Sequence, residues 1–90
     1  MSEGQRKILD IIAELSGLTT ITIIRDSVVV EYSDDNHLPA KEVHNYINQL
    51  QGLGYISIDT RARGSVDFRL INMTTKGLDA AASSDKQELR

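Results

Sequence analysis

The feature that most constrains the fold is a change in the period of the apolar residues near residue 53. Before it, apolar residues recur every three or four positions, which predicts a helix over 39–52: Val43, Tyr46, Ile47 and Leu50. After it they fall at every second position, which predicts an antiparallel hairpin: Ile56, Ile58, Val66, Phe68 and Leu70. A helix placed directly before such a hairpin predicts the α+β class.

Two further helices are expected at the ends of the chain. A helix over 3–16 is indicated by one apolar stripe: Ile8, Leu9, Ile11, Ile12 and Leu15. Ser2 and Gln5 have the spacing of a capping box, and Gly17 stands where a helix stop is expected. A short last helix begins at Thr74 or Thr75 and ends near residue 82. We therefore predict a domain over 1–82 and a disordered tail over 83–90.

The segment 18–33 has no single interpretation. Its β-branched residues favour a strand: Thr19, Thr20, Ile21, Thr22, Ile23, Ile24, Val28, Val29 and Val30. Residues 25–27 interrupt this run and suit the turn of a hairpin that pairs 19–24 with 28–33. A helix would have to be imposed by tertiary packing against this propensity. We predict an extra strand or hairpin at 19–33, with a helix as the alternative.

Length and composition allow one modest core. A chain of 90 residues with 40% apolar residues buries roughly 64% of its unfolded surface, enough for a small domain. There is no cysteine, which excludes disulfides and cysteine zinc sites. No apolar run reaches the ~18 residues of a membrane helix, and the first residues do not resemble a secretory signal. We expect a cytoplasmic location.

The charge is divided by region. The net charge of −3 argues against a sequence-blind binder of polyanions. Residues 18–37 hold one arginine and four acidic residues, whereas residues 55–76 hold four basic and two acidic residues. The charge is therefore negative in the first of these regions and positive in the second.

The candidate contact residues lie on two predicted elements. The polar face of helix 39–52 is rich in amides: Lys41, His44, Asn45, Asn48, Gln49 and Gln51. Amides offer donor and acceptor pairs to base edges, most naturally adenine, and Lys41 near the helix start suits a phosphate. The hairpin tip is predicted at 61–64, where Arg61 and Arg63 reach phosphates or a narrow minor groove. The alternative is that the amides solubilise a helix and the arginines protect a hairpin end.

The order of these elements resembles a winged helix-turn-helix domain. Residues 43–56, which close with Gly52, Leu53, Gly54 and Tyr55, resemble the recognition helix of MarR-like and PadR-like regulators. Residues 73–78 (Met-Thr-Thr-Lys-Gly-Leu) resemble the run that follows the wing in the same families. The resemblance implies a three-helix core with a C-terminal hairpin wing, helix 39–52 in the major groove of double-stranded DNA, and transcription regulation. These families place a short helix where this chain has the β-branched segment.

Partner and chemistry follow from the remaining residues. About five basic side chains are few for a duplex binder, so we expect a homodimer, formed through the apolar residues of 1–33. The alternative function is a winged-helix protein–protein interaction module without DNA binding, which the acidic stretch favours. His37 and His44 with Asp34 and Asp35 form no recognised metal spacing, and no nucleophile motif is present. We predict neither an enzyme nor a cofactor or metal site.

Overall fold

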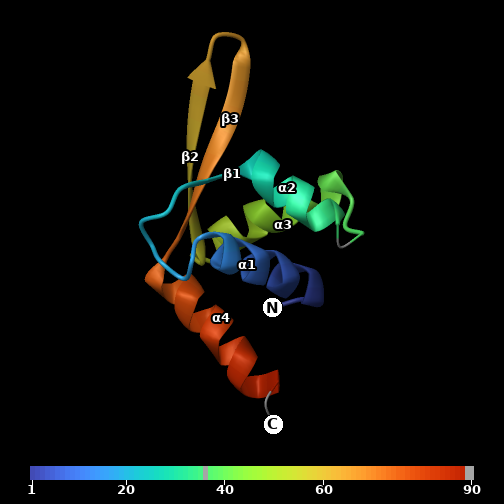
Figure 1. The fold of residues 1–90 in the computed structure, drawn as a ribbon, viewed down its shortest axis with the longest axis vertical. Helices are drawn as coiled ribbons and strands as arrows, with labels where there is room; N and C mark the ends of the chain where they lie inside the picture. The colour runs from blue at the N-terminus through green and yellow to red at the C-terminus, as the bar shows by residue number, and fades with distance from the viewer. Residues whose placement is uncertain (36, 89–90) are drawn as a thin grey trace.

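The structure is a computed structural model that describes residues 1–35 and 37–88, with side chains described as far as residue 82 (Figure 1). The helices and strands follow one another along the chain as α1 (Glu3–Leu15), β1 (Ile24–Arg25), α2 (Asp26–Asp34), α3 (Ala40–Gly52), β2 (Ile56–Arg63), β3 (Val66–Met73) and α4 (Thr75–Glu88). The predicted α+β class, with a helical core and a hairpin after α3, is confirmed.

The core lies between the helices and the lower half of the sheet. It is a single cluster of buried apolar side chains: Ile8, Leu9, Ile12, Ala13, Ile24, Val29, Val43, Ile47, Leu50, Ile56, Ile71, Met73 and Ala81. Each fully buried isoleucine or leucine contributes roughly 1.5–3 kcal/mol of transfer free energy. The predicted stripes of α1 and α3 both face this cluster, and the capping box of Ser2 and Gln5 is present. Pro39 is the N-cap of α3, one position earlier than the first helical position.

The hairpin predicted within 19–33 is wrong. Only Ile24 and Arg25 form a strand there, and residues 26–34 form helix α2 in spite of three consecutive valines. α2 packs against α1 and α3 and buries Val29 completely. The free energy of this packing outweighs the low helix propensity of the valines. Ser33, also fully buried, donates its hydroxyl to the Val29 carbonyl at 2.7 Å and is satisfied inside the helix. With α2 present, α2 and α3 form the helix pair that the resemblance implied.

The sheet has three antiparallel strands in the order β1-β3-β2. β2 and β3 pair from Ile56 with Met73 to Arg63 with Val66, so the turn is the two residues Gly64 and Ser65. Gly64 has a φ of +66°, which a glycine adopts without strain. The predicted tip at 61–64 is therefore displaced: Arg61 and Arg63 belong to the regular strand β2.

The face of β3 that meets the core is set by tertiary structure. Val66, Phe68 and Leu70 give the alternation that predicts the strand, but Val66 is 62% exposed. The buried residues of β3 are Ile71 and Met73, which point to the other face of the sheet. The apolar alternation therefore predicts the strand but not its buried side.

Helix α4 is longer than expected. Its backbone is helical as far as Glu88, so the helix end predicted near residue 82 is wrong. The backbone of residues 83–88 is therefore helical where a disordered tail was predicted. Residues 89 and 90 lie outside the described residues. The domain boundary at residue 82 stays a prediction.

Candidate nucleic-acid interface

The exposed side of α3 carries one polar stripe. Lys41, Asn45 and Asn48 are exposed and lie three or four positions apart, so they share one face of the helix. The opposite face is the fully buried row of Val43, Ile47 and Leu50. In Figure 1, α3 lies beside the base of the ribbon formed by β2 and β3. The structure thus brings three of the predicted contact residues together on an open surface.

Two of the predicted residues lie at the edges of this stripe. Gln49 accepts a hydrogen bond at 2.6 Å from the Nε2 of Gln5, so its side chain joins α3 to α1. His44 is half-buried on the other edge. Gln51 is exposed near the end of α3. Gln49 is therefore exposed but already engaged in a hydrogen bond between the surfaces of α3 and α1.

Arg69 of β3 is a residue that the sequence analysis missed. Its Nη1 donates to the Oδ1 of Asn48 at 2.6 Å, and its Nη2 lies 2.9 Å from the Nδ1 of His44. Its Nε lies 3.5 Å from the carboxylate of Asp26, the first residue of α2. The side chains of Arg69 and Asp26 are only 25% and 18% exposed. One guanidinium thus joins β3, α2 and α3.

A signal for Arg69 was present in the sequence. Arg69 precedes Ile71 and Met73 by two and four positions, so it points to the same face of β3 as these buried residues. An arginine in such a row requires polar partners, because a buried guanidinium is costly when unpaired. This signal identifies Arg69 as a site residue only when the buried face of β3 is already known.

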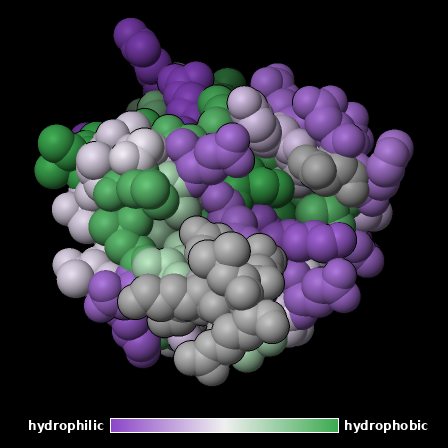
Figure 2. Space-filling view, turned by 60° about the horizontal axis from the view of Figure 1, so that its bottom comes forward, coloured by the Kyte–Doolittle hydropathy of each residue, from purple (hydrophilic) through white to green (hydrophobic). Residues whose placement is uncertain are grey.

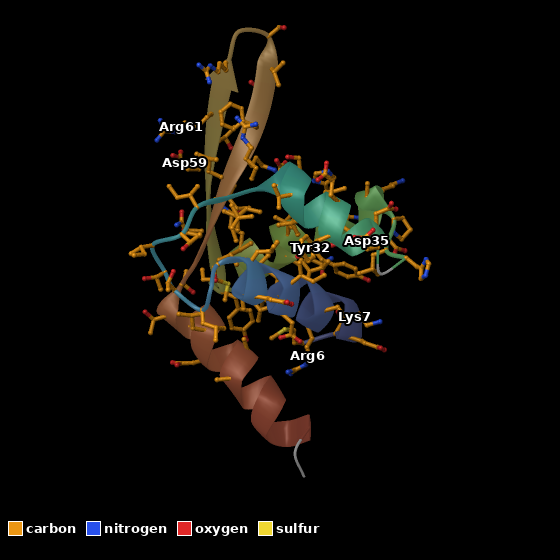
Figure 3. All side chains as sticks on the ribbon, in the orientation of Figure 1. Arg6, Lys7, Tyr32, Asp35, Asp59 and Arg61 are labelled. Atoms are coloured by element: carbon orange, nitrogen blue, oxygen red, sulfur yellow. The ribbon has the colours of Figure 1, made fainter. Side chains whose placement is uncertain are left out.

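Arg61 and Arg63 lie on the opposite face of the ribbon from Arg69. Thr60 is the partner of Arg69 across the two strands, and side chains alternate along β2, so its neighbour Arg61 points the other way. Figure 3 shows Arg61 and Asp59 projecting from β2 on the side away from the helices, and their Nε and Oδ2 atoms are 2.8 Å apart. The structure does not bring these two arginines to the α3 stripe.

Arg61 and Arg63 instead share their face of the ribbon with Arg25, a second residue that the sequence analysis missed. The guanidinium of Arg25 lies 4.5 Å from the ring centre of Phe68, a cation–π contact. Arg25, Arg63 and Phe68 also line a hollow of about 390 Å³. The outer face of the sheet therefore carries three arginines, Arg25, Arg61 and Arg63, against the carboxylate of Asp59, and the hollow is also lined by Asp26 and Asp67.

The turn after α3 is held by the start of α4. Thr74 donates its hydroxyl to the Gly54 carbonyl at 2.7 Å and accepts the N–H of Gly77 at 3.0 Å. The ammonium of Lys76 donates to the Leu53 carbonyl at 2.9 Å and lies 5.3 Å from the ring centre of Tyr55. The two sequence runs that carried the family resemblance thus contact each other directly. Their role is to fix the end of α3 relative to the ribbon.

Two expectations from the sequence concern features that should be absent, a membrane-spanning helix and a metal site. Within residues 1–35 and 37–88, no helix is long and apolar enough to cross a membrane. Among the side chains that the structure describes, those of residues 1–35 and 37–82, no three from histidine, aspartate or glutamate gather as metal ligands would. The Nδ1 of His44 is engaged by Arg69.

A helix pair with an exposed second helix, followed by a β-hairpin that stands out from the body, defines a winged-helix domain (Figure 1). Solved structures share this fold, among them the following two. A PadR family transcriptional regulator from Eggerthella lenta DSM 2243 superposes with a TM-score of 0.67 and 16% identity, over 92% of this chain and 73% of that chain. Bacillus subtilis PadR in complex with operator DNA gives a TM-score of 0.69 and 15% identity, over 92% of this chain and 46% of that chain.

The chain therefore has the winged-helix fold of the PadR structures, and it spans less than half the length of the Bacillus subtilis protein. No family model and no curated protein matches the sequence.

Proposed function

We propose that this chain is a small cytoplasmic transcriptional regulator that binds double-stranded DNA sequence-specifically and performs no catalysis. The observation that carries the proposal is the exposed stripe of Lys41, Asn45 and Asn48 on α3, beside a ribbon that carries arginines. The fold that carries this arrangement is similar to that of Bacillus subtilis PadR, whose structure contains operator DNA.

The geometry supports a division of roles. An α-helix fits the major groove, where the amides of Asn45 and Asn48 meet base edges. Lys41, in the first turn of α3, meets a phosphate together with the N–H groups of the helix start. The ribbon extends beyond the helices, so Arg61 and Arg63 contact phosphates beside the groove without touching α3 (Figure 3). Bases are read by the helix, and the ribbon adds affinity.

The double substitution Arg61→Ala with Arg63→Ala tests the role of the ribbon. We expect it to weaken binding to a labelled pool of random duplexes by about tenfold, equally for all sequences, because phosphate contacts carry no sequence information. Titration of the pool by fluorescence anisotropy measures the effect. Lys7→Ala is the control, since Lys7 lies on α1 away from the ribbon and should bind like the parent (Figure 3). A parent chain that binds no duplex would refute the proposed function.

We also propose that the protein acts as a homodimer through residues 1–33. The loop between α1 and β1 exposes three large apolar residues: Leu18 at 67%, Ile21 at 84% and Ile23 at 59%. The loop is fixed in place, because the side-chain amide of Asn72 donates to the carbonyls of Thr20 and Thr22. Figure 2 shows apolar surface gathered on the left, the side on which this loop lies in Figure 1. A second copy covering this surface would remove it from water.

Ile21→Asp tests the dimer. We expect the variant to sediment as a monomer at micromolar concentration and to unfold at the temperature of the parent, because Ile21 is 84% exposed. Val66→Asp, a change at an exposed apolar residue outside 1–33, should leave the dimer intact. A parent chain that is already monomeric by analytical ultracentrifugation would contradict the dimer.

A further inference from the structure

The guanidinium of Arg69 determines how two side chains of α3 are oriented. An arginine carries five N–H donors and no acceptor, so every atom that it contacts through a hydrogen bond must accept. The atom of Asn48 that faces Arg69 is therefore its carbonyl oxygen, at 2.6 Å from Nη1. The atom of His44 that faces Arg69 is Nδ1, at 2.9 Å from Nη2, and it accepts only when the imidazole is neutral with its proton on Nε2.

The same contacts decide what α3 presents to solvent. With the Oδ1 of Asn48 turned toward Arg69, the amino group Nδ2, a donor, is the part of the amide that is left for a ligand. With the Nδ1 of His44 accepting, the remaining nitrogen of that ring, Nε2–H, is also a donor. Asn45 is exposed and no such contact with a described side chain holds it, so its amide is free to rotate. At Asn48 the amide therefore directs its amino group away from Arg69, while Arg69 occupies one of the two lone pairs of the amide oxygen.

Arg69 is itself held in place. Its Nε lies 3.5 Å from the carboxylate of Asp26, and the side chains of this pair are 25% and 18% exposed. Asp26 is the first residue of α2 and also accepts the N–H of Ser27 at 2.9 Å, so the carboxylate is fixed to the helix start. A guanidinium with three neighbouring partners does not turn out to a phosphate without breaking these contacts. Its position is set before any duplex arrives.

From this geometry we infer that Arg69 is a positioning residue that makes Asn48 read guanine, an inference that rests on the proposed function. Bidentate recognition of adenine requires one donor and one acceptor from the amide, for N7 and N6 respectively. Guanine presents two acceptors, N7 and O6, to the major groove, and an amino group is the matching partner. Because Arg69 already occupies one lone pair of the Asn48 oxygen, the acceptor needed for the N6 amino group of adenine is weakened, and the preference at Asn48 shifts from adenine to guanine.

The experiment compares base preference in the parent and in Arg69→Met. The full chain is used to select from a pool of random duplexes of about 20 base pairs, the span of two half-sites. Affinities are then measured for duplexes that differ at one base pair. We expect one position at which the parent prefers guanine over adenine by about tenfold, and we expect Arg69→Met to lose that preference. Methionine keeps an unbranched stem that reaches the position of Nε but removes every donor, so the amide of Asn48 turns freely.

A double substitution separates positioning from direct contact. In the Asn48→Ala background, Arg69→Met should change the base preference no further, since the residue through which it acts is gone. A shift that persists in that background would mean that Arg69 acts through His44 or touches the DNA itself, and the inference about Asn48 would be overturned. Arg61→Met is the matched control: it removes an arginine from the opposite face of the ribbon and should lower affinity without changing base preference.

The remaining outcomes are also decisive. Thermal unfolding shows whether Arg69→Met folds; if it does not, Arg69→Lys, which keeps a cation for Asp26 but cannot hold both partners, takes its place and should show a reduced guanine preference. A parent that prefers adenine at every position dependent on Asn48 overturns the inference while leaving the proposed function intact. A parent that binds no duplex refutes the proposed function.

Discussion

The affinity of this protein for duplex DNA should fall about 10³-fold when the salt concentration rises from about 50 to about 200 mM. The reason is counterion release: each phosphate neutralised by a cation contributes about −0.9 to the slope of log K against log salt. Lys41, Arg25 and Arg63 are the side chains placed to meet phosphates without an ion pair of their own. Arg61 also reaches a phosphate but shares its charge with the carboxylate of Asp59, so it adds little to counterion release, and Arg69 is held by Asp26. Three contacts in each protomer of the proposed homodimer make six, which gives the stated change.

The measurement is anisotropy titration of one selected duplex at four or more salt concentrations. Lys41→Gln removes one contact from each protomer and should reduce the slope by about two. A winged-helix module that binds only proteins would show no duplex affinity at any of these concentrations. A measurable affinity that does not change with salt would contradict the phosphate contacts proposed for these residues.

The largest loss of stability is expected for Gly77→Ala. Gly77 is buried in the first turn of α4, and a Cβ built there overlaps the backbone carbonyl oxygen of Tyr55. The carbonyl belongs to the turn that Thr74 and Lys76 hold, so it has little freedom to move away. Overpacking against backbone should cost about 3 kcal/mol and lower the melting temperature by about 15 °C in a domain of this size.

Gly52→Ala is the matched control for this substitution. Gly52 is the last residue of α3, and a Cβ there meets no atom within 4 Å. Alanine favours the helix over glycine, so Gly52→Ala should be neutral or slightly stabilising. Thermal unfolding followed by circular dichroism compares both with the parent. If Gly77→Ala has the melting temperature of the parent, α4 and the turn after α3 are not in the close contact described.

Helices α1 and α3 and the hairpin could be predicted because their patterns are local. A stripe at three- and four-residue spacing forms one face of a helix wherever the helix is placed, and residues 43, 47 and 50 are buried in that way. The capping box of Ser2 and Gln5 is equally local, because both hydrogen bonds close within one turn. The α3 stripe of Lys41, Asn45 and Asn48 followed from the same periodicity. For these elements the sequence was sufficient.

Helix α2 and the ribbon arginines could not be predicted in this way. The valines of α2 favour a strand, and only packing against α1 and α3 makes the helix the lower free-energy state. The buried face of β3 depends on which side of the sheet the helices cover, and this decides that Arg69 faces α3 while Arg61 and Arg63 face away. The position of Arg69 in the site was missed for that reason.

The sequence by itself determined the identity and order of most elements, since hydrophobic period and capping act over distances of a few residues. Tertiary structure alone decided the conformation of residues 26–34, the inward face of β3 and the contact of one guanidinium with Asp26, His44 and Asn48. These partners are 43, 25 and 21 residues from Arg69 along the chain, and the pairing of charged and polar groups over such separations depends on where the fold places them.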